Sequence, residues 1–256
     1  MGVELTGKRL GLIGCGNIGA IVAERARGLK MRVAAYDPYL SDERAAQLGV
    51  TKVELDQLFA EADIITLHTP MTDATRNIID AGAIQKMKAG VRIINCARGG
   101  LVDEVALRGA LETGHVAGAA FDVFVEEPAK ENVLFGAPNF IATPHLGAST
   151  SEAQEKVALQ VAEQMSDYLL TGAVTNAVNM PSVTAEEAPL LKPYMKLAEN
   201  LGAFSGQVIG SAIKSISIEF EGLAAEINPA PVVAAALTGV LKPTLTSVNM
   251  VSAPAE

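Results

Sequence analysis

The segment from Lys8 to Asp37 contains two short apolar runs separated by a stretch with helical periodicity. The first run ends in the glycine pattern GCGNIG, residues 14–19. Between a strand and a helix, such glycines permit a tight turn, close approach of a pyrophosphate and close packing of the helix on the strand. The segment therefore predicts a βαβ unit that binds a dinucleotide.

The second apolar run ends in Asp37, at the position where this kind of unit commonly carries an acidic residue. A carboxylate there can accept hydrogen bonds from both ribose hydroxyls of the adenosine, and it repels a 2′-phosphate. The sequence therefore favours NAD over NADP. The alternative interpretation is a glycine-rich core turn followed by a capping aspartate.

Apolar runs and helical stretches continue to alternate after this unit, in ADIITLHTP, AGAIQKMKAG, VRIINCA, DEVALRGALETG, VAGAAFDVF and FIATP. The strand segments are almost continuously hydrophobic, as expected for strands that are buried on both faces. The pattern predicts an α/β fold, with a doubly wound parallel sheet of the Rossmann type.

The pattern changes after Gly147. STSEAQEKVALQVAEQMSDYLLTG predicts one long helix that ends at Gly172. An extended piece, a helix around 189–204, a strand with Ile216, Ile218 and Phe220 alternating, an Ala-rich helix and a final short strand are expected to follow. We expect three regions: an NAD-binding domain (1–148), a helix (149–173) and a smaller, incomplete α+β domain (174–256).

The composition narrows the classes of partner. A net charge of −9 over 256 residues argues against nucleic acid. Two cysteines are too few for a disulfide scaffold, and neither a secretory leader nor an apolar run long enough to span a membrane is evident. We expect a cytoplasmic protein with a small-molecule substrate and no membrane partner, and we assign no metal ligands.

Polar residues follow the predicted strands, at the edge where doubly wound sheets bind ligands. They are His68 and Thr69, Arg98, Asp122 and Glu127, and His145. A histidine with a carboxylate forms a general acid/base pair, and an arginine can hold a substrate carboxylate. The combination suits an α-hydroxy acid. Taken singly, each residue also has a structural interpretation, as a turn cation, a loop acid or a helix cap, and His115 is assigned a structural role.

These segments closely resemble the D-isomer-specific 2-hydroxyacid dehydrogenases, through GLIGCGNIG, VAAYDP, LHTPMTDATRNIID, RIINCARGGLVDEVAL, GAAFDVFVEEP and TPHLGAST. The resemblance runs from about Leu5 to Val178. It implies that Arg98 binds the substrate carboxylate, that His145 accepts the proton and that Glu127 orients His145. The residues expected to line the cofactor site are Gly14, Gly16, Asn17, Ile18, Gly19, Asp37, His68, Thr69, Pro70, Cys96, Ala97, Arg98, Asp122, His145, Gly147 and Ala148, with Cys96 as a small buried hydrophobe.

The tail, from AVTNAVNMPSV to VNMVSAPA, resembles the extra domain of one branch of that family. The branch implies oxidation of 3-phospho-D-glycerate to 3-phosphohydroxypyruvate, the first step of phosphorylated L-serine biosynthesis, by a homo-oligomer joined through the NAD domains. The family's N-terminal substrate segment has no counterpart before the glycine turn, so we expect a fragment that is weak or inactive alone. Two alternatives stay open: a glyoxylate or hydroxypyruvate reductase of the same family, and a non-catalytic NAD-binding module.

Overall fold

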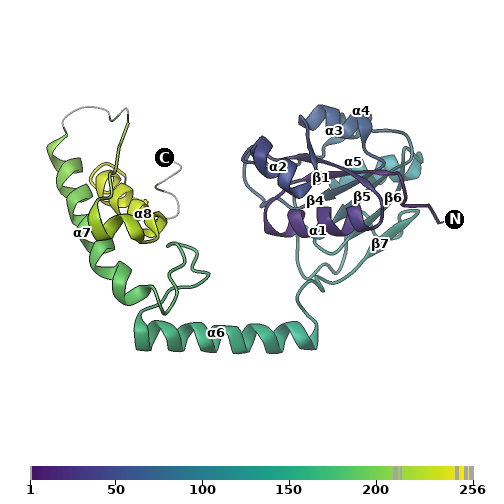
Figure 1. Ribbon diagram of the computed structural model, residues 1–256. Helices are drawn as coiled ribbons and strands as arrows, with labels where there is room; N and C mark the ends of the chain where they lie inside the picture. The colour runs from purple at the N-terminus through teal and green to yellow at the C-terminus, as the bar shows by residue number, and fades with distance from the viewer. Residues whose placement is uncertain (1, 210–212, 214, 246–247, 251–252, 254–256) are drawn as a thin grey trace. The chain divides into compact units, whose positions relative to one another are not determined.

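The computed structural model describes residues 2–209, 213, 215–245, 248–250 and 253. The chain divides into two compact units, residues 1–150 and 151–256. Each unit is described by itself below (Figure 1). Within the described residues, no helix combines the length and the apolar character that crossing a bilayer requires.

The first unit is a sheet of seven parallel strands in the order β3-β2-β1-β4-β5-β6-β7. The chain starts in the middle of the sheet, builds outward to β3, and returns across β1 to build the other half, which gives the reversal typical of doubly wound sheets. The predicted α/β fold is confirmed. The strands are β1 (Arg9–Ile13), β2 (Arg32–Tyr36), β3 (Thr51–Lys52), β4 (Ile64–Leu67), β5 (Val91–Asn95), β6 (Val116–Phe121) and β7 (Phe140–Ala142).

Helices pack on both faces of this sheet. Buried residues of α1 (Asn17–Gly28) and α2 (Asp42–Leu48) share a core cluster with Leu10 and Leu12 of β1. The other face is covered by α3 (Leu55–Glu61), α4 (Ala81–Lys86) and α5 (Glu104–Glu112), whose buried residues cluster with Ile13 and Ile93. Alternate residues of one strand thus enter opposite cores, because successive side chains point to opposite faces.

The second unit begins with the long helix α6 (Ser151–Thr171), which confirms the predicted long helix. None of its residues is buried. The helix ends where Gly172 adopts a φ of +75°, and Lys192 Nζ donates to the carbonyl of Thr171 at 3.1 Å. An antiparallel bridge between Val174 and Val183 follows.

The helices α7 (Ala188–Val208) and α8 (Pro229–Leu241) pack closely, with the short 3-10 helix η1 (Gly222–Glu226) between them in the chain. A Cβ on Gly202 would lie 2.1 Å from the carbonyl oxygen of Ala236, and one on Gly239 would lie 2.3 Å from that of Glu199. The two helix backbones therefore approach closely only because these positions lack side chains.

The sequence prediction was wrong for one element of this unit. Residues 215–220 are not in a strand. Ile218 and Phe220 are partly buried and Ile216 is exposed, so the alternation marks a partly buried extended segment. A strand also needs a hydrogen-bonded neighbour, and periodicity does not supply one. The final short strand expected after the Ala-rich helix lies mostly outside the described residues.

Candidate functional site

The glycine turn joins the carboxyl end of β1 to the first turn of α1. Gly14 has a φ of +92°, and a Cβ there would lie 2.6 Å from the carbonyl oxygen of His68. A Cβ on Gly19 would lie 2.3 Å from the carbonyl oxygen of Gly14. Both glycines are therefore required by the packing of β1, α1 and the end of β4. By contrast, nothing lies within 4 Å of a Cβ on Gly16, so the space above this residue is open.

The first turn of α1 is suited to an anion. Gly16 is the N-cap and provides no side-chain hydrogen bond, and the first turn carries no acidic residue. The free amides and the positive end of the helix dipole thus face the open space above Gly16. Asn17 and Ile18 begin the helix there, and Ile18 is 63% exposed. These features fit the pyrophosphate of a dinucleotide.

Asp37 lies beside this turn, at the end of β2. Its Oδ2 accepts from the amide of Cys15 at 2.8 Å, and its Oδ1 accepts from the amide of Tyr39 at 2.9 Å. A carboxylate has about four acceptor sites. Two contacts to the backbone therefore orient the group and leave acceptor capacity for ribose hydroxyls.

His68 and Thr69 follow β4 next to the glycine turn, where the amide of His68 donates to Ile13 at 2.7 Å. The imidazole is within hydrogen-bond distance of Thr66, with 3.1 Å from Nε2 to Oγ1. Burial lowers the pKa of His68, so its ring is neutral at pH 7. His68 therefore places a neutral polar side chain beside the glycine turn. Pro70 follows on the exposed loop, where its carbonyl accepts from Thr75.

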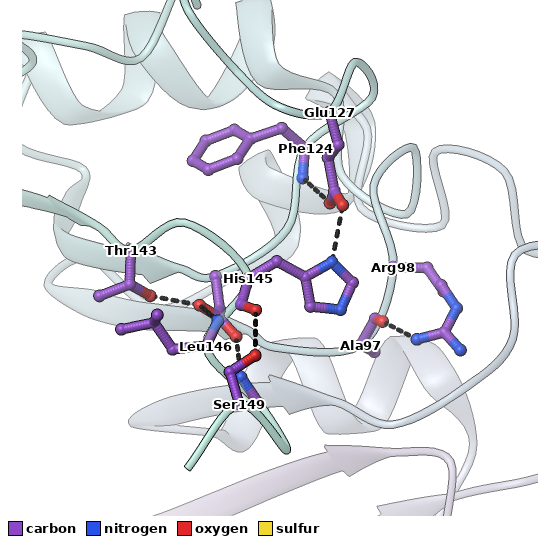
Figure 2. A network of polar contacts seen from close by, with 10 residues as sticks. Ala97, Arg98, Phe124, Glu127, Thr143, His145, Leu146 and Ser149 are labelled. Carbon is purple, nitrogen blue, oxygen red and sulfur yellow. Dashed lines mark hydrogen bonds and ion pairs between the residues drawn. The ribbon is translucent and has the colours of Figure 1, made fainter. Parts of the chain in front are cut away.

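His145 and Glu127 are in direct contact, although they lie eighteen positions apart in the sequence. Nδ1 of His145 lies 2.6 Å from Oε2 of Glu127, and the other oxygen of Glu127 accepts from the amide of Phe124 at 3.0 Å. Figure 2 shows the imidazole pointing at the carboxylate, with Arg98 on a different loop. These hydrogen bonds, with His145 first, hold the pKa of Glu127 below its ordinary value. Glu127 is therefore an anion at neutral pH.

The backbone of His145 lies in the left-handed region, with a φ of +55°. The turn that contains His145 is held by Asp122, which directly follows β6. Oδ1 of Asp122 accepts from Thr143 Oγ1 at 2.5 Å and from the amide of Leu146 at 2.7 Å, and Oδ2 accepts from the amide of Gly147 at 3.0 Å. Burial alone would raise the pKa of Asp122, but these hydrogen bonds lower it below its ordinary value. A buried carboxylate thus stabilises a turn that is unfavourable for a non-glycine residue.

Arg98 lies on the loop after β5, and its Nη1 donates to the carbonyl of Ala97 at 2.6 Å. Its side chain is exposed, as is Cys96. The expectation that Cys96 is a buried hydrophobe is therefore wrong, because the residue follows the last residue of β5 and leaves the covered part of the sheet. His115, expected to be structural, contacts the carbonyl of Ile84 at 2.9 Å.

A pocket of about 490 Å³ adjoins the His145–Glu127 pair, with the further lining residues Asp122, Phe124, Pro128, Ala129, Phe135, Ala142, Thr143 and Pro144. Its lining is mostly apolar and does not include Arg98 or the glycine turn. The lining holds no arginine or lysine that could pair with a substrate carboxylate, so we do not assign this pocket to the substrate. Within the described residues, no cluster of His, Cys, Asp or Glu suits a metal ion.

Sequence reasoning missed two polar residues of this site, Thr143 and Asn95. Both lie at strand ends, as the residues that it singled out do, and Asn95 is buried. A polar residue that interrupts an apolar run, as in VRIINCA, was the signal that could have identified Asn95.

Comparison with known proteins assigns the chain to a family. Residues 1–147 match the model of the D-isomer specific 2-hydroxyacid dehydrogenase NAD binding domain. The chain therefore belongs to this family of dehydrogenases, and its cofactor is NAD. Residues 190–256 match the D-3-phosphoglycerate dehydrogenase intervening domain.

Among curated relatives, the D-3-phosphoglycerate dehydrogenase of Synechocystis sp. is 49% identical over 100% of this chain and 47% of its own length. That of Bacillus subtilis is 45% identical, over 99% of this chain and 48% of its own length. The chain thus spans just under half the length of these two relatives.

Solved structures show the same fold. A glyoxylate reductase from Paecilomyes thermophila superposes with a TM-score of 0.63 at 37% identity, over 70% of this chain and 54% of its own. The D-lactate dehydrogenase of Escherichia coli gives 0.60 at 34% identity, over 68% and 55%.

Proposed function

We propose that this chain carries the cofactor site and the acid/base pair for NAD-dependent oxidation of 3-phospho-D-glycerate to 3-phosphohydroxypyruvate. The observation that carries the proposal is the 2.6 Å contact between His145 Nδ1 and Glu127 Oε2 at the carboxyl edge of the sheet. The choice of substrate rests on the relatives named D-3-phosphoglycerate dehydrogenase and on the intervening-domain match.

The ionised state of Glu127 determines which nitrogen of His145 can act as the base. An ionised carboxylate only accepts hydrogen bonds, so Nδ1 of the neutral imidazole must be the donor. Nε2 is then left with a free lone pair. His145 accepts the hydroxyl proton at Nε2, and Glu127 holds the ring orientation and stabilises the imidazolium that results.

Arg98 contributes the cation that a hydroxy acid requires. Its guanidinium can pair with the substrate carboxylate in a bidentate manner, which fixes the hydroxyl carbon relative to His145. Bound NAD would supply the hydride acceptor for that carbon. The residues that hold it are the glycine turn and the first turn of α1 at the pyrophosphate, and Asp37 at the ribose.

The further residues proposed to line the cofactor site are His68, Thr69, Pro70, Cys96, Ala97, Asp122, Gly147 and Ala148.

We also propose that the protein is cytoplasmic and that it assembles as a homo-oligomer through its nucleotide-binding unit. Sedimentation of this unit over a range of concentrations would check the assembly.

A substrate panel tests the choice of reaction. NADH formation is measured with 3-phosphoglycerate, glycerate and D-lactate, and NADH consumption with glyoxylate and hydroxypyruvate. We expect the phosphorylated acid to be preferred and His145→Ala to abolish turnover while NADH still binds. The glyoxylate reductase structure makes a reductase of the plain acids the second candidate, and preference for glyoxylate or hydroxypyruvate would support it.

A further inference from the structure

Asn95 is the last residue of β5, and its side chain is buried with 1% of the residue exposed. A buried amide is unfavourable unless its donor and acceptor groups find partners. Asn95 finds them in the loop that carries Arg98. Nδ2 donates to the carbonyl of Arg98 at 2.9 Å, and Oδ1 accepts from the amide of Ala97 at 3.1 Å. One side chain thus binds the backbone of two consecutive residues in the turn that presents the guanidinium.

The same loop is fixed from its other side by Gly99. A Cβ on Gly99 would lie 1.9 Å from the carbonyl oxygen of Phe124, so the loop backbone touches the backbone of the segment after β6. The amide of Phe124 donates to Glu127. In addition, the carbonyl of Asn95 accepts from the amide of Asp122 at 2.9 Å. The loops that carry Arg98 and Glu127 are therefore joined through their backbones. Asn95 takes part through its carbonyl, and its side chain bonds the loop of Arg98.

We propose that Asn95 is a positioning residue, which fixes the Arg98 guanidinium relative to the His145–Glu127 pair by closing the loop 96–98. This inference rests on the proposed function, because it takes Arg98 as the group that binds the substrate carboxylate. Both side-chain hydrogen bonds of Asn95 go to the backbone of its own loop, so we assign it no direct role toward the reacting atoms. Its effect is on where the guanidinium lies before the substrate arrives, which governs substrate binding more than proton transfer.

Two substitutions separate the two hydrogen bonds. Asn95→Ala removes both, whereas Asn95→Asp keeps the acceptor for Ala97 and removes the donor to Arg98. The matched control is Asn132→Ala. Asn132 also accepts from a backbone amide two residues ahead and donates through Nδ2, but to Glu104 instead of Arg98. All three variants are made in the full 256-residue chain.

The first measurement is ¹⁵N NMR of Arg98, which requires no turnover. In both Asn95 variants we expect the backbone amide and guanidinium resonances of Arg98 to shift, and their relaxation to show a more mobile side chain. In Asn132→Ala we expect these resonances to stay in place. We expect the amide resonances of β1 and β2 to stay in place, which shows that the sheet still folds. Unchanged Arg98 resonances would overturn the inference, and so would loss of the dispersed β1 and β2 resonances in both Asn95 variants, which would assign the residue to folding.

The second measurement is steady-state kinetics with 3-phosphoglycerate. A misplaced guanidinium should raise KM about tenfold in both Asn95 variants, the effect of one lost charge-assisted contact, with a smaller change in kcat. A normal KM in Asn95→Asp would refute the role of the Arg98 contact. If the unmodified chain shows no turnover with any acid, the proposed function fails, while the NMR result still decides the position of Arg98.

Discussion

At the scale of single residues, the site depends on carboxylates whose acceptor positions are filled by the protein itself. Glu127 accepts from Phe124 and contacts His145, and Asp122 accepts three hydrogen bonds. Both carboxyls have a lowered pKa for this reason. In the proposed reaction, the orientation and tautomer of His145 are then set before any substrate binds, which reduces the reorganisation required.

Glu127→Gln tests the role of that carboxylate. Glutamine keeps the size of the side chain but removes the charge that selects the Nδ1–H tautomer and stabilises the imidazolium. We expect kcat for 3-phosphoglycerate to fall by about 10²-fold or more, with NADH affinity unchanged. The measurement is steady-state turnover alongside NADH titration. Full activity in this variant would exclude Glu127 from the acid/base pair.

Asp122→Asn tests how the turn at His145 is held. The amide replaces a charged acceptor by a group with two donors, so one of the three donors that face it loses its partner. Unfolding should become easier by roughly 2 kcal/mol or more, measured by urea denaturation at pH 7.

The pH dependence provides a second check on Asp122. Its pKa is lowered in the folded state, so its contribution to stability is present above the unfolded value, about 4, and is lost as pH falls through the folded value. The difference in stability between the unmodified chain and Asp122→Asn should therefore shrink as the pH falls below 4. A difference that stays constant from pH 7 to pH 3 would show that the charge of Asp122 is not what stabilises the turn.

At the scale of elements, the inner strands of the first unit could be predicted because strands buried on both faces are continuous apolar runs. The two-residue strand β3, which is exposed, gave no such signal and was missed. The rule that ligands bind at the carboxyl ends of such strands also predicted which edge carries Arg98, Glu127 and His145. The hydrogen bonds that hold them could not be predicted. Asn95 closes its own loop and Thr143 bonds Asp122 of a neighbouring strand, so these partners depend on local turn geometry and on strand register.

The first turn of α1 allows a test of cofactor binding that is independent of folding. Gly16→Ala adds a methyl group where nothing lies within 4 Å, and the backbone of Gly16 has an ordinary φ of −69°. The chain should therefore fold normally, while the methyl occupies the space proposed for the pyrophosphate. We expect the Kd for NADH to rise at least about tenfold. Gly28→Ala, at the other end of the helix and equally unobstructed, is the control and should bind NADH normally.

Where α7 and α8 cross, we expect a Gly→Ala substitution to impair folding, unlike at Gly16. A Cβ on Gly239 would lie 2.3 Å from a backbone carbonyl of α7, so Gly239→Ala must push the helices apart. We expect it to destabilise the second unit by roughly 1–3 kcal/mol, measured by denaturation, without changing NADH binding by the first. In the control, Gly109→Ala within α5, the new methyl meets nothing within 4 Å and should stabilise its helix by about 0.5–1 kcal/mol. Equal effects of the two substitutions would contradict the close crossing.

At the scale of the whole molecule, the chain combines a well-formed candidate nucleotide site with proposed reacting groups that are open to water. The glycine turn, the first turn of α1 and Asp37 are in place, whereas the side chains of His145 and Glu127 are 47% and 34% exposed. Cofactor binding needs only the first set of features. Hydride and proton transfer also need an enclosed pair, because water screens charges and competes for the hydrogen bonds.

We therefore expect the 256-residue chain to bind NADH and to turn over 3-phosphoglycerate weakly. The chain contains no tryptophan, so binding is best followed by the emission of the reduced nicotinamide or by calorimetry. The Kd is compared with that of Gly16→Ala, and turnover with that of His145→Ala, which gives the background rate. Binding with turnover above this background supports an acid/base pair that functions although it is exposed. Binding with no turnover above background favours a nucleotide-binding module, and turnover at the rate of an efficient dehydrogenase would show that enclosure of His145 is not required.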